Sequence, residues 1–376
     1  MLKTNSKNRY SPNNFMKLNI LRVFSFVALI GILPSLALLQ SCGEDNGPDT
    51  DDGYNREALL QVYSNWLQTE YSLLENELTD FQTEIEAFKT QADDNTLLKL
   101  QEAFKTSYIQ WQRLDFLPIE SAMDAYLVES ANTYPTKAEL IETNIADENT
   151  NLEPINQLAA QGFPGLEYLL FTKEIEYLSD AKTIAYIDLL SQRLIDKVKS
   201  TTDGWQAQEN DFIKNSGSDG GSSISTLFNA LVKNFEQRTR DAKIGVPAGV
   251  RTDNIIQPEQ CEALYAGYSL ELLNANISAL KDFFNGTADE GFDNYLDYLK
   301  SEKDGQPLSA AINAQFDAIT VSIEAIDWPL SESIKTDKLP AINAFNEMQK
   351  MVVLLKVDMA PELGILINYA DNDGDS

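Results

Sequence analysis

Apolar side chains recur along this chain mostly every three or four positions, the spacing that places them on one face of an α-helix. The first such stripe runs from Arg56 to about Ala92. The same spacing returns over residues 97–114, 184–198, 224–235, 259–284, 316–323 and 341–355. No segment shows the strict alternation, bounded by turns, that is typical of a β-strand. We therefore expect an all-α protein built from helical bundles.

Turn-forming residues divide this helical region near its middle. Residues 215–223 read NSGSDGGSS, a polar, glycine-rich loop. The loop separates two predicted domains, 56–215 and 222–376, each long enough for about four antiparallel helices. Serine is a preferred N-cap residue, so Ser222 or Ser223 is expected to cap the helix after the loop, and Ser331 or Ser333 the last long helix. The pattern predicts two domains that resemble four-helix bundles.

The N-terminal residues are typical of an export signal. Lys17 and Arg22 accompany an apolar run that ends near Gln40 and is too short for a confident membrane span. Residues 1–41 are therefore predicted to be a signal peptide, with Met16 as a possible true start. The stretch Leu-Gln-Ser before Cys42 resembles the lipobox of bacterial lipoproteins, which implies that Cys42 is lipidated and becomes the mature N-terminus. An uncleaved signal anchor is the alternative.

Residues 42–55 are acidic and contain almost no large apolar side chains, so they are predicted to form a solvated tether. With the lipid on Cys42, the membrane would be one partner. The expected location is the cell envelope of a Gram-negative bacterium, as an outer-membrane lipoprotein that faces either the periplasm or the surface.

The charge balance limits the partners. Removal of residues 1–41 takes away five basic residues and no acidic one, so the formal net charge of −29 becomes −34. Such a surface repels phosphates and anionic headgroups, which argues against a nucleic-acid partner and favours cations.

The complete absence of histidine limits the chemistry. Catalysis by a serine or cysteine paired with histidine is excluded, as are the usual histidine metal sites. Carboxylates remain, and they could bind a hard cation or act as an acid–base pair where two or more converge. The candidates in irregular or pocket-forming stretches are Asp115, Glu120, Glu167 and Glu262. Each alone is more often a cap, a salt-bridge partner or a surface charge, and Cys261 is expected to be a buried apolar residue.

Six stretches stand out along the mature chain: SYIQWQRLDFLPIE (107–120), TYPTK (133–137), QGFPGLEYLLF (161–171), RDAKIGVPAG (240–249), PEQCEALYAGYSLELL (258–273) and ELGILINYADNDGD (362–375). Together and in this order they resemble the imelysin family. Its members are helical cell-envelope proteins once classed as peptidases and linked to bacterial iron uptake. The resemblance implies two four-helix-bundle domains with a cleft between them.

The resemblance also implies a metal or catalytic site at a short sequence motif. The family signature is Gly, one residue, His, two residues, Glu. Gly162 and Glu167 occupy its outer positions, whereas Pro164 stands where the histidine would be and has no ligand atom. Proline suits the first turn of a helix. Further residues that the resemblance marks are Lys243, Gly245, Pro247, Gly249 and Ser269.

Three functions remain open at this point. The first is a lipid-anchored, non-catalytic protein that binds a small ligand or a partner in the interdomain cleft, associated with iron or haem uptake, with a divalent cation or iron as its possible cofactor. The second is a peptidase-like hydrolase that uses Glu167 with another carboxylate and a metal, although the lack of histidine argues against it. The third is a structural module that docks onto another envelope protein.

Overall fold

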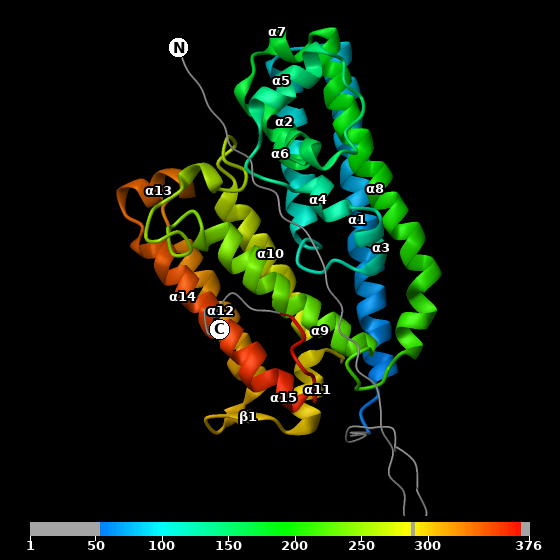
Figure 1. Cartoon of the computed structure of the whole chain (residues 1–376), viewed down its shortest axis with the longest axis vertical. Coiled ribbons are helices and arrows are strands. Elements are labelled where there is room, and N and C mark those ends of the chain that lie inside the picture. Colours follow the sequence, from blue (N-terminus) through cyan, green and yellow to red (C-terminus); the bar gives the residue numbers. More distant parts are fainter. Residues whose placement is uncertain (1–52, 287–289, 370–376) are drawn as a thin grey trace, which may run out of the picture. The chain divides into compact units, whose positions relative to one another are not determined.

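The computed structural model describes residues 53–286 and 290–369, which belong to one compact unit (Figure 1). The long helices are α1 (Arg56–Thr90), α2 (Asp94–Gln112), α8 (Ala181–Lys214), α9 (Ser223–Asn234), α10 (Ser269–Asn285), α12 (Leu308–Glu324) and α14 (Leu339–Val353). The shorter α-helices are α3 (Glu120–Asp124), α4 (Leu127–Ala131), α5 (Ala138–Ala146), α6 (Gly162–Thr172), α7 (Ile175–Leu178), α11 (Phe292–Leu299), α13 (Leu330–Thr336) and α15 (Ala360–Glu362).

Four helical segments depart from α geometry. Two are 3₁₀ helices, η1 (Ile155–Ala160) and η3 (Pro258–Gln260), and two are π-helices, η2 (Phe235–Gly245) and η4 (Leu354–Met359). In the described residues, strand pairing is limited to a two-residue antiparallel hairpin of β1 (Glu302–Lys303) and β2 (Gln306–Pro307). The prediction of an all-α fold is confirmed.

The helices form two groups that follow the order of the chain (Figure 1). In the first, α1 packs along α2 and α8, and α6 packs against both α2 and α8. The stripe predicted for α1 faces this interior, since Leu74, Leu78, Phe81 and Ile85 are all fully buried. In the second, α14 packs on α12 and η2, and α10 packs on α12. Burial of these stripes, rather than helix propensity, is the main source of helix stability here.

The two groups share an apolar contact between α10 and the first group. The Phe283 ring of α10 stacks on Tyr63 of α1 with 4.3 Å between centroids. The same ring meets Trp66 at 5.2 Å and Phe116 at 5.7 Å. Aromatic pairs at such distances add to the free energy gained by burying their surface. The two groups are therefore packed on each other and do not form two separate cores.

The predicted helix boundaries are confirmed in most places and wrong in two. Ser222 caps α9, because its side chain accepts a hydrogen bond from the Ser225 N–H at 3.2 Å. Ser331 and Ser333 do not cap the last long helix, since they lie inside α13 and α14 begins only after Lys338. Pro329 directly precedes α13 and Pro340 lies in the first turn of α14, so the chain forms two successive helices here.

The helix predicted from Glu259 is also wrong over its first ten residues. Only the short η3 forms before Ser269, where α10 begins. Between them the backbone turns through left-handed conformations at Ala263 (φ 47°) and Gly267 (φ 76°), which a continuous α-helix cannot contain. This irregular segment, residues 261–268, carries much of the candidate site.

The predictions for the signal peptide, Cys42 and most of the tether lie outside the described residues. The division into domains 56–215 and 222–376 stays a prediction. Within the described ranges, no helix has the length and apolar character needed to cross a membrane.

Candidate functional site

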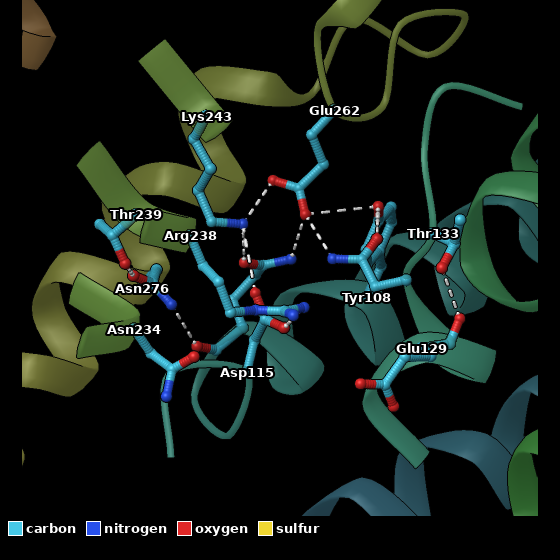
Figure 2. A network of polar contacts seen from close by, with 12 residues as sticks. Tyr108, Asp115, Glu129, Thr133, Asn234, Arg238, Thr239, Lys243, Glu262 and Asn276 are labelled. Atoms are coloured by element: carbon cyan, nitrogen blue, oxygen red, sulfur yellow. Dashed lines mark hydrogen bonds and ion pairs between the residues drawn. The ribbon is translucent and has the colours of Figure 1, made fainter. Parts of the chain in front are cut away.

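The Glu262 carboxylate lies at the centre of a buried polar cluster between the two groups of helices (Figure 2). Its Oε1 accepts hydrogen bonds from Asn132 Nδ2 at 2.7 Å and from Gln112 Nε2 at 2.9 Å. Its Oε2 pairs with Lys243 Nζ at 2.7 Å. The hydroxyl of Tyr108 donates to Asn132 Oδ1 at 2.7 Å and orients that amide. Every oxygen of this buried carboxylate is thus satisfied, as burial of a charge requires.

Lys243 holds the second predicted carboxylate in the same cluster. Its ammonium lies 3.6 Å from Asp115 Oδ2 and donates to Gln112 Oε1 at 2.7 Å. Asp115 also pairs with Arg238 through a 2.7 Å contact. Burial alone would raise the pKa of Asp115, but Arg238 and Lys243 outweigh it and hold that pKa below its usual value. The cluster contains two carboxylates and two cations.

The π-helix η2 positions both cations. It directly continues α9, and it presents Arg238, Thr239 and Lys243 toward the cluster (Figure 2). Thr239 donates to Asn276 of α10 at 2.7 Å, and the Asn276 amide donates to the carbonyl of Gln112 at 3.0 Å. π-Helical segments are rare and often occur at functional sites. The contacts from η2 therefore join the end of α2 to α10.

Glu167 of α6 binds the irregular segment 261–268 by a separate set of contacts. Its Oε1 accepts the backbone N–H groups of Tyr265 at 2.6 Å and Ala266 at 2.8 Å. Its other oxygen accepts no hydrogen bond from a described residue, and the side chain is only 2% exposed. Glu167 lines a pocket of about 240 Å³ whose other walls include Tyr134, Glu259 and Cys261.

Burial raises the pKa of Glu167 to about 7, against the opposing effect of the two backbone hydrogen bonds and with a smaller contribution from the negative charge of Glu262. Near neutral pH this carboxyl can therefore either accept or donate a proton. A group with these properties in a pocket is a candidate for ligand binding or for acid–base chemistry.

Gly162 and Pro164 explain how α6 brings Glu167 to this place. Gly162 has a φ of +66°, and a Cβ on it would lie 2.3 Å from the carbonyl oxygen of Ala131, so only glycine fits. Pro164 is the third residue of α6, within the first turn, where the missing N–H costs nothing. The prediction that Pro164 belongs to the first turn is confirmed. Its carbonyl accepts a hydrogen bond from Thr136 at 3.0 Å.

The remaining motif residues shape the backbone around the cluster. Gly245 ends η2, and a Cβ there would lie 2.9 Å from the Phe345 ring. Gly249 has a φ of +85°. The carbonyl of Pro247 accepts the Gln257 N–H at 2.9 Å, and the hydroxyl of Ser269 donates to the carbonyl of Glu262. These residues therefore fix the loops that carry Lys243 and Glu262.

Two sequence candidates lie outside the cluster. Glu120 is exposed at the start of α3, in a different pocket. Cys261 is buried and apolar, as expected, and burial raises the pKa of its thiol to about 12, so it is a poor nucleophile.

The cluster does not fit a metal ion. Lys243 already supplies the positive charge that neutralises Glu262 and lies close to Asp115, so a cation would have to displace a buried ammonium. Among the described residues there is no group of three or more His, Cys, Asp or Glu side chains that could hold a metal. The pocket at Glu167 offers carboxylates only from Glu167 and from Glu259, so a cation bound there would keep much of its own hydration or other ligands.

Several residues of the cluster had no individual signal in the sequence. These are Tyr108, Gln112, Asn132, Arg238 and Asn276. Tyr108 and Gln112 lie inside the stretch 107–120, so its composition pointed to the right segment without naming the side chains. Their role depends on contacts across more than a hundred residues, which one sequence does not show.

The chain is thus an all-helical protein with a buried ionic cluster and a carboxylate pocket between two groups of helices. Residues 67–346 match the family model described as imelysin, and the chain belongs to the imelysin family. No curated protein matches the sequence.

Two solved structures have a similar fold. One is an iron-regulated protein A precursor from Parabacteroides distasonis, with a TM-score of 0.70, 17% identity, and coverage of 81% of this chain and 94% of the other. The second is an imelysin-like protein from Psychrobacter arcticum, with a TM-score of 0.68, 18% identity, and coverage of 84% and 97%. At these identities the likeness shows the fold alone.

The substitution Lys243→Met should destabilise the protein by about 3–5 kcal/mol, because it leaves the buried Glu262 without its cation. The double substitution Lys243→Met/Glu262→Gln should recover part of this loss, because both members of the pair are then neutral. Urea unfolding measures both effects. The control is Lys281→Met, which removes an exposed pair with Asp317 and should cost less than about 1 kcal/mol. A Lys243→Met protein as stable as this control would contradict the conclusion that Lys243 neutralises the buried charge of Glu262.

The raised pKa of Glu167 predicts a pH-dependent stability. Because the native state binds the proton more tightly than the unfolded chain, this contribution is fully present below the ordinary pKa of 4.5 and is lost as the pH rises through about 7. Relative to Glu167→Gln, the wild-type protein should therefore lose up to roughly 3 kcal/mol of unfolding free energy between pH 4.5 and pH 8. Urea unfolding at both pH values tests this, with exposed Glu176→Gln as the control. A difference that is constant with pH would refute the raised pKa.

Proposed function

We propose that this protein is a lipid-anchored, non-catalytic binding protein of the cell envelope whose ligand occupies the pocket beside Glu167. The proposal rests on the hydrogen bonding of that carboxylate. One oxygen is fixed by two backbone N–H groups, and the other, which no described residue engages, belongs to a side chain that lines the pocket. A carboxylate oxygen without a protein partner, on a residue that lines a pocket, is available to accept a hydrogen bond from a ligand or to bind a cation.

The dimensions of the pocket favour a small ligand. Its volume of about 240 Å³ lies below the range of roughly 300–1,000 Å³ that is typical of sites for drug-sized molecules. Two carboxylates, Glu167 and Glu259, line it without a basic residue. The ligand we propose is a compact cation, either hydrated or chelated, or a small molecule with a cationic group, rather than haem itself. Membership of the imelysin family, and the iron-regulated relative of similar fold, support a role in iron acquisition.

Binding is tested by thermal unfolding of the purified protein with ferrous iron, ferric citrate, Ca²⁺, Mg²⁺ or haem. We expect stabilisation by an iron probe or a divalent cation, since a ligand at a hundred times its Kd adds about 2.7 kcal/mol to the native state. The effect should disappear in Glu167→Gln and persist in Glu176→Gln, which changes an exposed carboxylate nearby. Failure of every probe to shift the wild-type protein would contradict the small-ligand proposal.

A second candidate function is hydrolysis, and the pKa of about 7 at Glu167 is the observation that favours it. A general acid or base with such a pKa is well matched to neutral pH. However, the pocket lining contains no second buried carboxylate and the chain contains no histidine. If the protein is a hydrolase, Glu167→Gln should abolish cleavage of a peptide substrate. Full activity of this variant would exclude hydrolysis that depends on Glu167.

The proposed anchor is the lipid on Cys42, which would hold the protein at the outer membrane of a Gram-negative cell. The lipobox-like sequence before Cys42 and the acidic residues after it support this proposal. In fractionated cells the wild-type protein should sediment with membranes, and Cys42→Ser should move to the soluble fraction. A wild-type protein whose mature N-terminus carries no lipid mass would disprove the anchor.

A further inference from the structure

A second pocket, separate from the one at Glu167, lies between the segment 117–123, the C-terminal end of α8 and the start of α9. Its volume is about 680 Å³, which is within the range of sites for small organic ligands. None of its lining residues belongs to the pocket of Glu167 or to the polar cluster. It is therefore an independent feature of the fold.

The walls of this pocket are largely apolar and include an aromatic pair, with uncharged polar side chains from Gln208, Asn215, Ser223 and Thr226. Trp205 and Phe212 of α8 form an edge-to-face pair with 5.0 Å between ring centroids. Leu117 and Leu227 supply buried aliphatic surface, whereas Met123 lines the pocket with 55% of its side chain exposed. The indole N–H of Trp205 is buried and has no acceptor among the described residues, as is also the case for Trp111 in the core.

The charges that line the pocket all have the same sign. They are the carboxylates of Glu120 and Asp211, and no lysine or arginine contributes to the lining. Neither carboxylate accepts a hydrogen bond from, or pairs with, a residue in the described part of the chain. Some exposed acids elsewhere are neutralised, as Asp317 is by Lys281. The pocket thus combines apolar walls with two uncompensated negative charges.

We propose that this pocket binds a small organic cation with an apolar body. The ammonium or guanidinium group lies near Glu120 and Asp211, where it neutralises the two carboxylates. The apolar body packs on Leu227 and on the aromatic pair, whose ring faces also attract a cation. The formal net charge of −29 attracts such ligands over a longer range. This site does not depend on the function proposed for Glu167.

Calorimetric titration with three probes of the same shape tests the proposal. 4-Phenylbutylammonium should bind at least tenfold more tightly than 4-phenylbutanol, and 4-phenylbutyrate should not bind. The double substitution Glu120→Gln/Asp211→Asn should remove the preference for the cation. Asp203→Asn changes an exposed carboxylate of α8 that does not line the pocket, so it is the matched control and should retain the preference.

Occlusion of the pocket gives a second readout. Ala207 is exposed on α8 and lines the pocket, so Ala207→Trp should fill it without disturbing the core and should abolish binding of the cation. The thermal unfolding temperature of this variant verifies that it folds. The proposal is overturned if 4-phenylbutylammonium does not bind, if the alcohol binds as tightly, or if the preference survives the double substitution. Undiminished binding to folded Ala207→Trp would overturn it as well.

Discussion

The ion pair between Lys243 and Glu262 constrains the rest of this structure. Both side chains are almost completely buried, and removal of two charges from water costs more than their mutual attraction returns unless further hydrogen bonds complete them. Those hydrogen bonds come from Gln112 and Asn132, which belong to the first group of helices, whereas the ion pair belongs to the second. Neither group can therefore satisfy the cluster alone, and their association is a condition for burying the charges.

The irregular segment 261–268 contains Glu262 and also forms one wall of the pocket beside Glu167. If these residues continued α10 toward its N-terminus, as their apolar spacing suggests, the N–H groups of Tyr265 and Ala266 would bond within the helix. Instead these two N–H groups donate to Glu167, so a buried carboxyl oxygen replaces the carbonyl acceptors that a helix would have supplied. The pocket beside Glu167 exists because this short segment is not helical, and its position is fixed by the same carboxylate that it surrounds.

The helices could be predicted because a helix that buries one face has apolar residues about every three or four positions, as α1 does. Of the four candidate carboxylates, Asp115, Glu167 and Glu262 are buried and hydrogen-bonded or ion-paired, and their role in ligand binding stays a prediction. Glu120 shared their local context but is exposed, because a turn next to apolar residues does not reveal which side faces water.

Other parts of the site could not be predicted from one sequence. The apolar spacing over residues 259–268 indicates burial. Because both a helix and a tightly packed loop can be buried, this spacing alone could not distinguish them, and the helix prediction failed there. Arg238, Gln112 and Asn132 are polar residues on helical or turn segments that normally face solvent. Only the packing of the two groups brings Arg238 to Asp115 and the two amides to Glu262, and that packing depends on many contacts that are far apart in the chain.

Gln112 and Lys243 are separated by 131 residues, so their hydrogen bond closes a long loop of the chain. The entropy lost on closing such a loop must be met before the contacts return free energy, so the cluster is expected to form late in folding. Until the second group of helices docks, Asp115 has neither Arg238 nor Lys243, and its charge must remain hydrated. The end of α2 is therefore expected to stay open to water until that docking completes the interior of the first group.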